Sequence, residues 1–413
     1  MSLYTRLKVY SPQIWLLFWG SLLGSTGQAL VWPFLTITIR ERLDVPLTTI
    51  TLLFTLQSAM GFAATTVFGP LMDRFGRKWP MVVGLVASGL TLFGMSRAAT
   101  LVEWAVLLPL YAIVNALFRI GSYTMVADLV EPERRASVYA LLRMGDNTGI
   151  VSGPALGGFL VSEMYALPYY LGAVMQITLA VPVSLMIRET LVRGGRSDPA
   201  SATPAHAAGS GYSTLLHDRR FLAIWGLYIL VQIASSMVWV LLGLYVKENY
   251  GINEGRFGLI VATNAGMVVL FQYATTRVTD RLAPLPVSAL GALFYAAGLA
   301  AFGLSRSFAG FLAGMVVLTL GEMSLVPTLT ALVADIAPAP MRARYMGVFS
   351  LSFRIGTGIG PVIGGLLNEH IAPSATWFGG AAICVVAAAG FRLAARREAI
   401  PARARRALSK PLP

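Results

Sequence analysis

Charge and cysteine are scarce in this chain of 413 residues. Charged side chains make up 12% of it, about half the share usual in soluble domains. The single cysteine, Cys384, excludes an intramolecular disulfide, and three histidines leave no Cys/His cluster for a metal ion. A phosphate-binding glycine loop followed by lysine is also lacking. We therefore expect no enzyme, no metal, no cofactor and no ATP hydrolysis.

Apolar residues are abundant, at 56% of the chain with a mean hydropathy of +0.68. They gather in twelve segments, each near the ~20 residues that a helix needs to cross a bilayer. The segments lie at about 15–39, 47–68, 80–96, 103–127, 136–162, 168–187, 221–246, 257–275, 284–304, 308–334, 345–367 and 374–395. Helices satisfy their own backbone hydrogen bonds in lipid. We therefore predict an all-α membrane protein with twelve transmembrane helices in two pseudo-symmetric six-helix bundles.

The net charge of +13 could indicate nucleic acid, but its distribution favours topology. If the N-terminus is cytoplasmic, most lysines and arginines fall in the predicted inside loops. Few remain outside, among them Arg40, Arg42 and Lys247. This matches the positive-inside rule. We expect a multi-pass protein of a bacterial inner membrane with both termini cytoplasmic, no cleaved signal peptide and no nucleic-acid partner.

The two halves of the sequence repeat each other with an offset of 207 residues. Asp128 corresponds to Asp335, and Arg135 corresponds to Arg342. Duplicated membrane units often form a site at their common interface. We predict four parts: an N-terminal bundle at 1–187, a cytoplasmic linker at 188–220, a C-terminal bundle at 221–395 and a basic tail at 396–413.

A charged motif lies between the second and third apolar segments. Its residues are Gly69, Asp73, Arg74, Gly76, Arg77 and Lys78. Their spacing and position resemble the signature loop of the major facilitator superfamily. The second copy keeps Asp280 and Arg281, but Leu-Ala-Pro replaces Phe-Gly-Arg after them.

The resemblance implies a conformational latch on the cytoplasmic side. It places Asp73 against the start of the helix near Tyr345, and it pairs Arg77 with Asp128. A carboxylate is stabilised at a helix N-terminus, and arginine can bind a carboxylate through two hydrogen bonds. The alternative is that these are ordinary charged loop residues.

Glycines four residues apart mark one face of the fifth segment and recur in the eleventh. The residues are Gly149, Gly153, Pro154, Gly157 and Gly158, and then Gly356, Gly360, Pro361 and Gly364. Such spacing allows close helix contact, and proline loosens one backbone hydrogen bond. The first set resembles the helix 5 motif of antiporters in the superfamily, with Ala140 in place of its earliest glycine. General small-residue packing is the alternative.

Five ionisable residues lie inside predicted helices, where such groups indicate function. They are Arg119, Arg143, Asp146, Glu322 and Arg354. Similar depths predict ion-pair networks of Arg119 and Arg143 with Asp146, and of Glu322 with Arg354. The alternative is static structural pairing. Either acid could carry a proton.

Two of these residues also resemble motifs of the superfamily. Arg119 resembles the proton-coupling arginine of the helix 4 motif, and the segment from Glu322 to Pro327 resembles helix 10 of drug:proton antiporters. We therefore prefer Glu322 as the coupling acid.

Polar and aromatic residues of the first and seventh segments are candidates for a substrate cavity. They are Gln28, Trp32, Phe34, Tyr228, Gln232 and Trp239. Aromatic walls suit amphipathic or cationic molecules. Lipid-facing or packing roles are the alternative for each of them.

These features together predict a secondary active transporter that works by alternating access. We expect proton-coupled efflux, by antiport, of small amphipathic or drug-like molecules. The proton gradient would drive it, with substrate, protons and the lipid bilayer as partners and a monomer as the working state. A proton-coupled importer or a lipid flippase of the same fold, and a non-transporting membrane receptor or scaffold, stay open.

Overall fold

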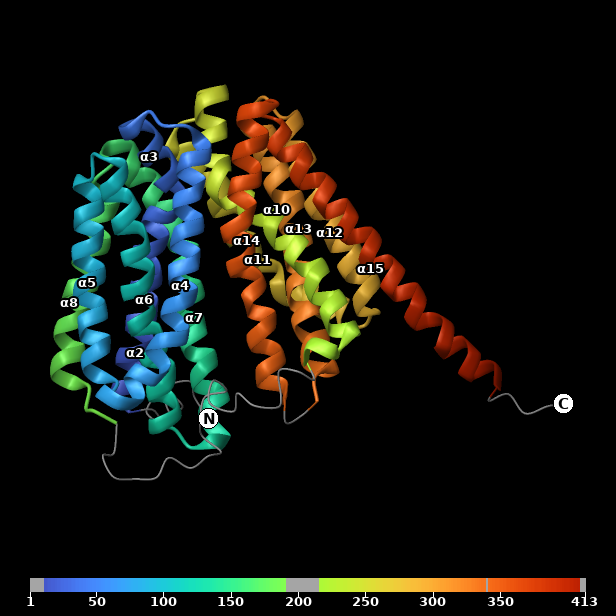
Figure 1. The fold of residues 1–413 in the computed structure, drawn as a ribbon, viewed down its shortest axis with the longest axis horizontal. Helices are drawn as coiled ribbons and strands as arrows, with labels where there is room; N and C mark the ends of the chain where they lie inside the picture. The colour runs from blue at the N-terminus through green and yellow to red at the C-terminus, as the bar shows by residue number, and fades with distance from the viewer. Residues whose placement is uncertain (1–10, 191–214, 339–340, 409–413) are drawn as a thin grey trace. The chain divides into compact units, whose positions relative to one another are not determined.

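The computed structural model describes residues 11–190, 215–338 and 341–408, and within these ranges it contains helices and no strand (Figure 1). The first half holds α2 (Pro12–Val31), η1 (Trp32–Phe34), α3 (Leu35–Leu43), α4 (Leu47–Phe75), α5 (Lys78–Arg97), α6 (Leu101–Leu129), α7 (Pro132–Glu163) and α8 (Leu167–Met186). The second half holds α10 (Arg219–Tyr250), α11 (Glu254–Thr279), α12 (Pro284–Leu304), α13 (Phe308–Ile336), α14 (Arg342–His370) and α15 (Ala375–Leu408).

Every predicted apolar segment lies in one of these helices, with α2, η1 and α3 sharing the first. Among the described residues, 11 helices are long and apolar enough to cross a membrane. The one predicted segment that is not among these 11 is the fifth, 136–162, which falls within α7, a helix of 32 residues. The prediction of an all-α membrane protein is confirmed.

The described residues form two compact units that cut across α10 and α11. One unit contains the described residues up to 190 together with Gly243–Ala265. The other contains the rest of α10 and the described residues from Gly266 onward. The C-terminal end of α10 and the N-terminal part of α11 therefore pack with the first half. The predicted domain boundaries at 187 and 221 stay predictions.

The predicted linker and tail are described only in part. Residues 191–214 of the predicted linker lie outside the described ranges. The predicted tail begins inside α15, which continues as a helix to Leu408. The first part of that tail is thus helical.

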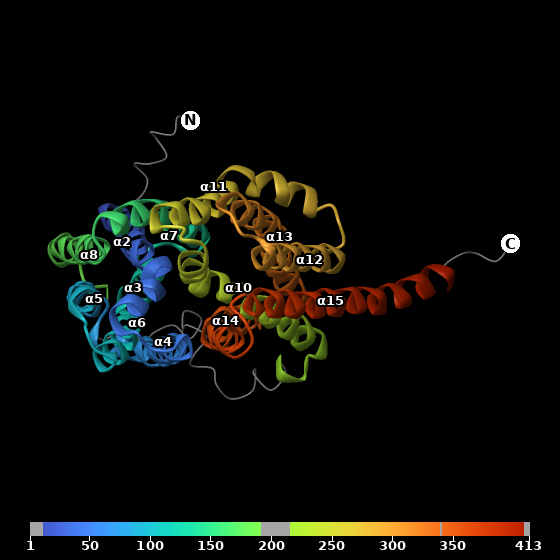
Figure 2. The same ribbon diagram turned by 90° about the horizontal axis from the view of Figure 1, so that it is seen from above.

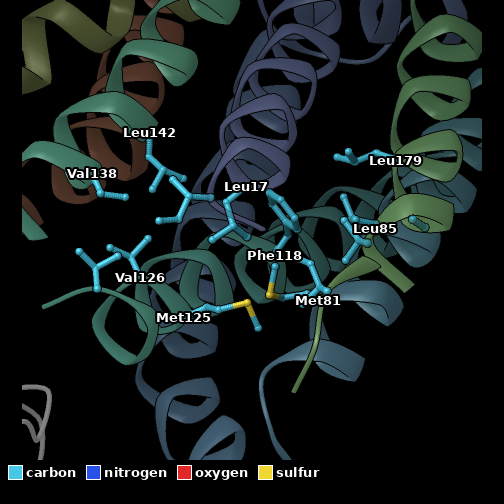
Figure 3. Packing of buried hydrophobic residues seen from close by; sticks show 14 residues of the cluster. Leu17, Met81, Leu85, Phe118, Met125, Val126, Val138, Leu142 and Leu179 are labelled. Carbon is cyan, nitrogen blue, oxygen red and sulfur yellow. The ribbon is translucent and has the colours of Figure 1, made fainter. Parts of the chain in front are cut away.

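An apolar cluster forms the core of the first unit where α2, α5, α6, α7 and α8 meet (Figure 3). Its buried members are Ile14, Leu17, Met81, Leu85, Phe118, Met125, Val126, Val130, Val138, Leu142, Leu179, Ala180, Val183 and Ile187. Lipid tails are as apolar as these side chains, so close packing rather than hydrophobic transfer holds such helices together. The cluster fixes the start of α5, where the loop motif ends, and the end of α6, which carries Asp128.

The glycine face of α7 packs along α2, as the spacing predicted (Figure 2). A Cβ on Gly149 would lie 2.6 Å from the backbone nitrogen of Thr26, and one on Gly157 would lie 2.5 Å from the carbonyl oxygen of Leu30. Real Cβ atoms do not come this close, because packing in helix interfaces is already at van der Waals contact. Glycine is therefore required at these crossings.

The second copy of the glycine face makes the equivalent contact with α10. A Cβ on Gly356 would lie 2.6 Å from the carbonyl oxygen of Gln232. One on Gly360 would clash with Ser236 and with the carbonyl of Ile233. Gln232 and Ser236 are the repeat equivalents of Ser25 and Ala29 on α2. The duplication is thus preserved in helix pairing as well as in sequence.

Candidate functional site

The loop motif begins in the last two turns of α4 and continues into the start of α5. Gly76 follows Phe75 with a φ of 93°, in the left-handed region that favours glycine. Its N–H donates to the carbonyl of Met72 at 3.0 Å. A Cβ at this position would also collide with the carboxylate of Glu189. The chain can therefore turn sharply here and enter α5.

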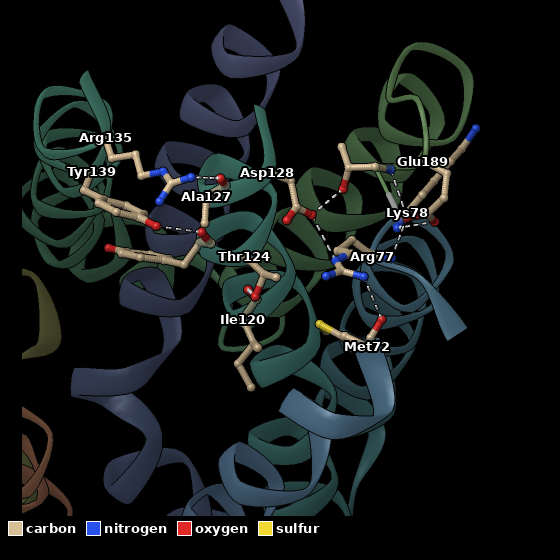
Figure 4. A network of polar contacts seen from close by, with 12 residues as sticks. Met72, Arg77, Lys78, Ile120, Thr124, Ala127, Asp128, Arg135, Tyr139 and Glu189 are labelled. Carbon is tan, nitrogen blue, oxygen red and sulfur yellow. Dashed lines mark hydrogen bonds and ion pairs between the residues drawn. The ribbon is translucent and has the colours of Figure 1, made fainter. Parts of the chain in front are cut away.

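Arg77 and Asp128 form the predicted ion pair, with Nε and Oδ2 3.1 Å apart (Figure 4). Arg77 is only 8% exposed, and its Nη1 also donates to the carbonyl of Met72 at 3.4 Å. Oδ2 of Asp128 accepts a further hydrogen bond of 2.7 Å from Thr190. The ends of α4 and α6 and the segment after α8 are thus joined through Asp128. Its role as a latch stays a prediction.

Glu189 is a part of this network that the sequence analysis missed (Figure 4). Its carboxylate accepts hydrogen bonds from the backbone N–H groups of Arg77 at 2.9 Å and Lys78 at 3.1 Å. These groups begin α5, and a negative charge is favourable at a helix N-terminus. Motif spacing alone could not reveal this contact, because Glu189 lies after α8, more than one hundred residues away.

The remaining members of the motif are Gly69, Asp73 and Arg74. The side chain of Asp73 lies outside the described residues, so its contact with the helix near Tyr345 stays a prediction. Arg74 is exposed and stacks over the ring of Phe75 at 5.5 Å. Tyr345 itself donates to Asp218 at 2.9 Å, within the second unit.

We expect Glu189→Ala to destabilise the start of α5. Loss of a capping acceptor costs about 1 kcal/mol, and two N–H groups depend on this carboxylate. Thermal unfolding of the purified protein in detergent should show a melting temperature a few degrees lower. Glu131→Ala is the matched control, since Glu131 precedes α7 without a side-chain capping bond. Equal melting temperatures for the two variants would contradict the capping role.

Asp146 lies half-buried on α7, facing α2. Its Oδ1 accepts a hydrogen bond of 2.9 Å from the hydroxyl of Ser25, and Ser21 is within reach of the same carboxyl. Arg119 on α6 acts on it electrostatically, but its guanidinium is exposed. In the described part of the chain, the direct partners of Asp146 are therefore hydroxyl groups. The prediction instead placed Arg119 and Arg143 beside Asp146, whereas its hydrogen bond comes from Ser25 on α2.

Two tyrosines extend the polar region around Asp146. The rings of Tyr123 and Tyr139 stack with centroids 5.4 Å apart, and Tyr139 donates to the carbonyl of Tyr123 at 3.1 Å. Arg119 and Arg143 both act electrostatically on Tyr123. The ion pairing of Arg119 and Arg143 with Asp146 stays a prediction.

Glu322 lies half-buried on α13 in the second unit. A Cβ on Gly321 would lie 2.6 Å from the carbonyl oxygen of Gly291, so α13 presses against α12 at this point. Glu322 acts electrostatically on two buried phenols, Tyr228 and Tyr295. Arg354 on α14 is also half-buried, and its pairing with Glu322 stays a prediction.

The predicted cavity residues differ in their surroundings. Gln28 is exposed, and Trp32 contacts the ring of Phe54 edge to face at 5.4 Å. Phe34 is 1% exposed and packs against Phe257 at 5.8 Å, so in this structure it is a packing residue. Gln28 and Trp32 line a small cavity of about 10 Å³ in the first unit, together with the buried amide of Gln57.

The residues predicted on α10 also lie close to other helices. Tyr228 is buried and stacks on Phe349 at 4.6 Å. Gln232 is half-buried beside Gly356, and Trp239 is half-buried. Their access to a substrate stays a prediction.

A second polar cluster lies away from the loop motif, and we call Glu41, Tyr165, Lys247 and Glu254 the Lys247 cluster. Lys247 donates to Glu41, Tyr165 and Glu254, and Tyr165 donates to Glu254. Burial and the hydrogen bond to Glu254 raise the pKa of the Tyr165 phenol well above its usual range. The phenol therefore keeps its proton and acts as a donor.

An exposed ion pair accompanies this cluster. Nε of Arg40 lies 3.1 Å from Oε1 of Glu248. The repeat offset relates Arg40 to Lys247 and Glu41 to Glu248, so the cation of each copy pairs with the acid of the other. In the sequence, Arg40 and Lys247 were interpreted only as charges outside the predicted cytoplasmic loops. The repeated cation–acid dipeptide was the signal that could have found both pairs.

Close backbone contact lies beside the Lys247 cluster. A Cβ on Gly158 of α7 would lie 2.9 Å from the Cα of Gly258 and 2.9 Å from the carbonyl oxygen of Glu254. A glycine of the predicted antiporter motif thus touches α11 directly. Any larger side chain at either glycine would force the two helices apart.

Long apolar helices, duplicated glycine faces and charged residues inside the helices define a multi-pass membrane transport protein. The sequence profile of the Major Facilitator Superfamily matches residues 17–234 and 224–412, and the chain belongs to this superfamily. The resemblance drawn from the loop motif is confirmed.

Several bacterial proteins resemble the chain over most of its length. It is 25% identical to the uncharacterized MFS-type transporter YqjV of Bacillus subtilis (strain 168), covering 87% of each chain. It is 24% identical to a Na(+), Li(+), K(+)/H(+) antiporter of Planococcus maritimus, over 91% of this chain and 92% of the other. It is 25% identical to the multidrug resistance protein MdtH of Salmonella arizonae (strain ATCC BAA-731 / CDC346-86 / RSK2980), over 73% and 72%.

Solved structures share the fold at lower identity. A bacterial homolog of the human lysosomal transporter Spinster, in an inward-facing and unoccupied conformation, matches with a TM-score of 0.75 and 17% identity over 93% of this chain and 96% of that one. The nucleoside transporter NupG matches with a TM-score of 0.78 and 13% identity over 93% and 99%. These likenesses concern the fold alone.

Proposed function

We propose that this transporter exports small amphipathic or drug-like molecules in exchange for protons. The observation that carries the proposal is the presence of one half-buried carboxyl group within a long helix of each half, Asp146 on α7 and Glu322 on α13. A carboxyl in such a place indicates an ion pathway or a proton relay. Each acid has hydroxyl or phenol groups around it rather than hydrocarbon alone.

The glycine contacts support movement between two arrangements. Gly158 and Gly258 allow α7 and α11 to touch through their backbones, and no side chains need to interlock there. The Lys247 cluster and the Arg77–Asp128 pair lie at different places along the helices of the first unit. Two separate polar contacts of this kind suit a cycle in which one end is held while the other opens. The antiporter and multidrug relatives are consistent with export.

The test uses purified protein in liposomes with an imposed pH gradient. We expect a lipophilic cation and protons to move in opposite directions, as followed by a fluorescent substrate and an internal pH dye. Replacing the substrate with Na⁺ separates drug export from the exchange named for the Planococcus relative. Movement of both species in the same direction would indicate an importer, and substrate movement without protons would remove the antiport proposal.

A further inference from the structure

An open hollow lies on the surface of α11 close to its C-terminal end. It measures about 400 Å³ and is lined by Tyr273, Ala274, Arg277, Val278 and Arg281. All five residues belong to α11 or to the turn directly after it. The hollow therefore depends on one element of the second unit and on no contact between the units.

The polar residues of this hollow lie at different depths along the helix axis. Tyr273 and Arg277 are four residues apart and share a face of the helix. Arg281 follows the end of α11, roughly 12 Å further along the axis than Tyr273. Tyrosine is favoured at the membrane interface, and arginine extends its head toward water and binds phosphate through two hydrogen bonds. The arrangement runs from the apolar region to the headgroup level.

The side chains of the hollow are available to a ligand. Tyr273 is 78% exposed and Val278 is 62% exposed. Within residues 11–190, 215–338 and 341–408, neither Arg277 nor Arg281 makes an ion pair. Asp280 is nearby but does not line the hollow, so the positive charges of the lining are not neutralised inside it. A role in stabilising the helix C-terminus would explain Arg277 but not the exposed Tyr273.

Apolar side chains continue from the hollow toward the middle of the helix. Val269 and Leu270, four and three residues before Tyr273, are 66% and 72% exposed. Hydrocarbon is the natural neighbour of such side chains on a spanning helix. A ligand with both a phosphate and an acyl chain would match the two guanidinium groups and this apolar strip together. Free phosphate would match the guanidinium groups but not the apolar strip.

We propose that this hollow binds the headgroup of an anionic phospholipid. Arg277 and Arg281 bind the phosphate, Tyr273 lies at the glycerol level, and an acyl chain follows Val269 and Leu270. This site is independent of the transported substrate and of the direction of transport. It also gives Arg281 a role, although the second copy of the loop motif has lost the glycine and arginine of the first.

The test is native mass spectrometry of the full chain with palmitoyl-oleoyl phosphatidylglycerol or with phosphatidylcholine of the same chains. We expect the wild type to retain phosphatidylglycerol preferentially. Arg277→Gln/Arg281→Gln should weaken this binding about tenfold or more, which corresponds to about 1.4 kcal/mol. The control Arg396→Gln/Arg397→Gln removes the same charge from exposed positions on α15 and should leave the binding unchanged.

Three results would overturn the proposal. An equal loss in both double variants would mean general charge attraction, and no loss in either would place the lipid elsewhere. Complete competition by millimolar inorganic phosphate or glycerol phosphate would indicate a soluble anion as the ligand. If Arg277→Gln/Arg281→Gln does not fold, Arg277→Lys/Arg281→Lys keeps the charge but loses the bidentate geometry, and it should still reduce the selectivity. Unchanged selectivity in that variant would also contradict the site.

Discussion

Glu322→Gln should abolish proton-driven accumulation of substrate while leaving exchange of substrate across the membrane intact. Glutamine has nearly the shape of glutamate but cannot gain or lose a proton. The contact of Gly321 with Gly291 holds this part of α13 against α12 in either case, so the side chain keeps its place. The change therefore removes the chemistry of the carboxyl with little effect on packing.

The size of the effect follows from the gradient. One pH unit is worth about 1.4 kcal/mol per proton, which sustains about tenfold accumulation for each proton exchanged. In liposomes with such a gradient, the wild type should accumulate substrate and Glu322→Gln should not. Counterflow, in which labelled substrate exchanges for unlabelled substrate without a gradient, should continue at a similar rate in both.

Two further variants make the result specific. Ser324→Ala is the inert control, because the hydroxyl of Ser324 bonds only to a carbonyl of its own helix among the described contacts. Asp146→Asn tests the other acid, which is held by Ser25. Loss of accumulation in Asp146→Asn but not in Glu322→Gln would assign the proton to Asp146. Our preference for Glu322 would then be wrong.

Much of the architecture was predictable, because apolar length and the repeat constrain a membrane protein strongly. Helices in lipid must satisfy their own backbone bonds, so each long apolar run became a helix. The glycine spacing predicted a close helix contact on one face of α7, and the clash that a Cβ on Gly153 would make with Ala29 identifies α2 as the partner helix. The Arg77–Asp128 pair followed from the resemblance of the loop motif.

The remainder depended on contacts that span long distances in sequence. Glu189 caps α5 only because the segment after α8 returns to that helix, and no periodicity encodes this path. Phe34 was placed in a cavity, but helix periodicity cannot tell a face that meets another helix from one that meets a substrate. The reciprocal pairs Arg40–Glu248 and Glu41–Lys247 follow from the repeat of a cation–acid dipeptide. Each dipeptide taken alone resembles any charged helix end.

Loss of the Lys247 cluster should give the second large effect, a shift in which end of the transporter is open. Glu254 is 6% exposed and accepts from both Lys247 and Tyr165. Removing one partner of a buried ion pair costs up to about 3–5 kcal/mol when the other charge is left without compensation, and Glu41, which stays bonded to Lys247, lowers this cost here. A change of about 5.5 kcal/mol converts a 99:1 equilibrium into 1:99. A cost of a few kcal/mol is a substantial part of that change, so Glu254→Gln should shift the equilibrium toward molecules in which the Lys247 cluster is broken.

Hydrogen–deuterium exchange in nanodiscs can distinguish such a shift from local unfolding. In Glu254→Gln, peptides around Gly158 and Gly258 should exchange faster. Peptides around Arg77 and Asp128 should change in the opposite direction, since opening one end of an alternating-access carrier requires the other to close. Faster exchange everywhere would mean destabilisation alone, and it would contradict a gating role.

The reciprocal pairing supplies the matched control and a rescue. Glu248→Gln breaks only the exposed pair with Arg40, and exposed pairs contribute about 0–1 kcal/mol, so exchange should stay close to the wild type. Exchanging the charges, as Glu41→Lys with Lys247→Glu, keeps one attraction but places Glu254 beside a second carboxylate. This double variant should therefore open nearly as far as Glu254→Gln at neutral pH. Adding Glu254→Lys should restore slow exchange. It places a cation at position 254, where it can pair with the glutamate that Lys247→Glu introduces. Failure of the triple variant to restore protection would show that packing at Gly158 and Gly258, rather than charge, holds this end closed.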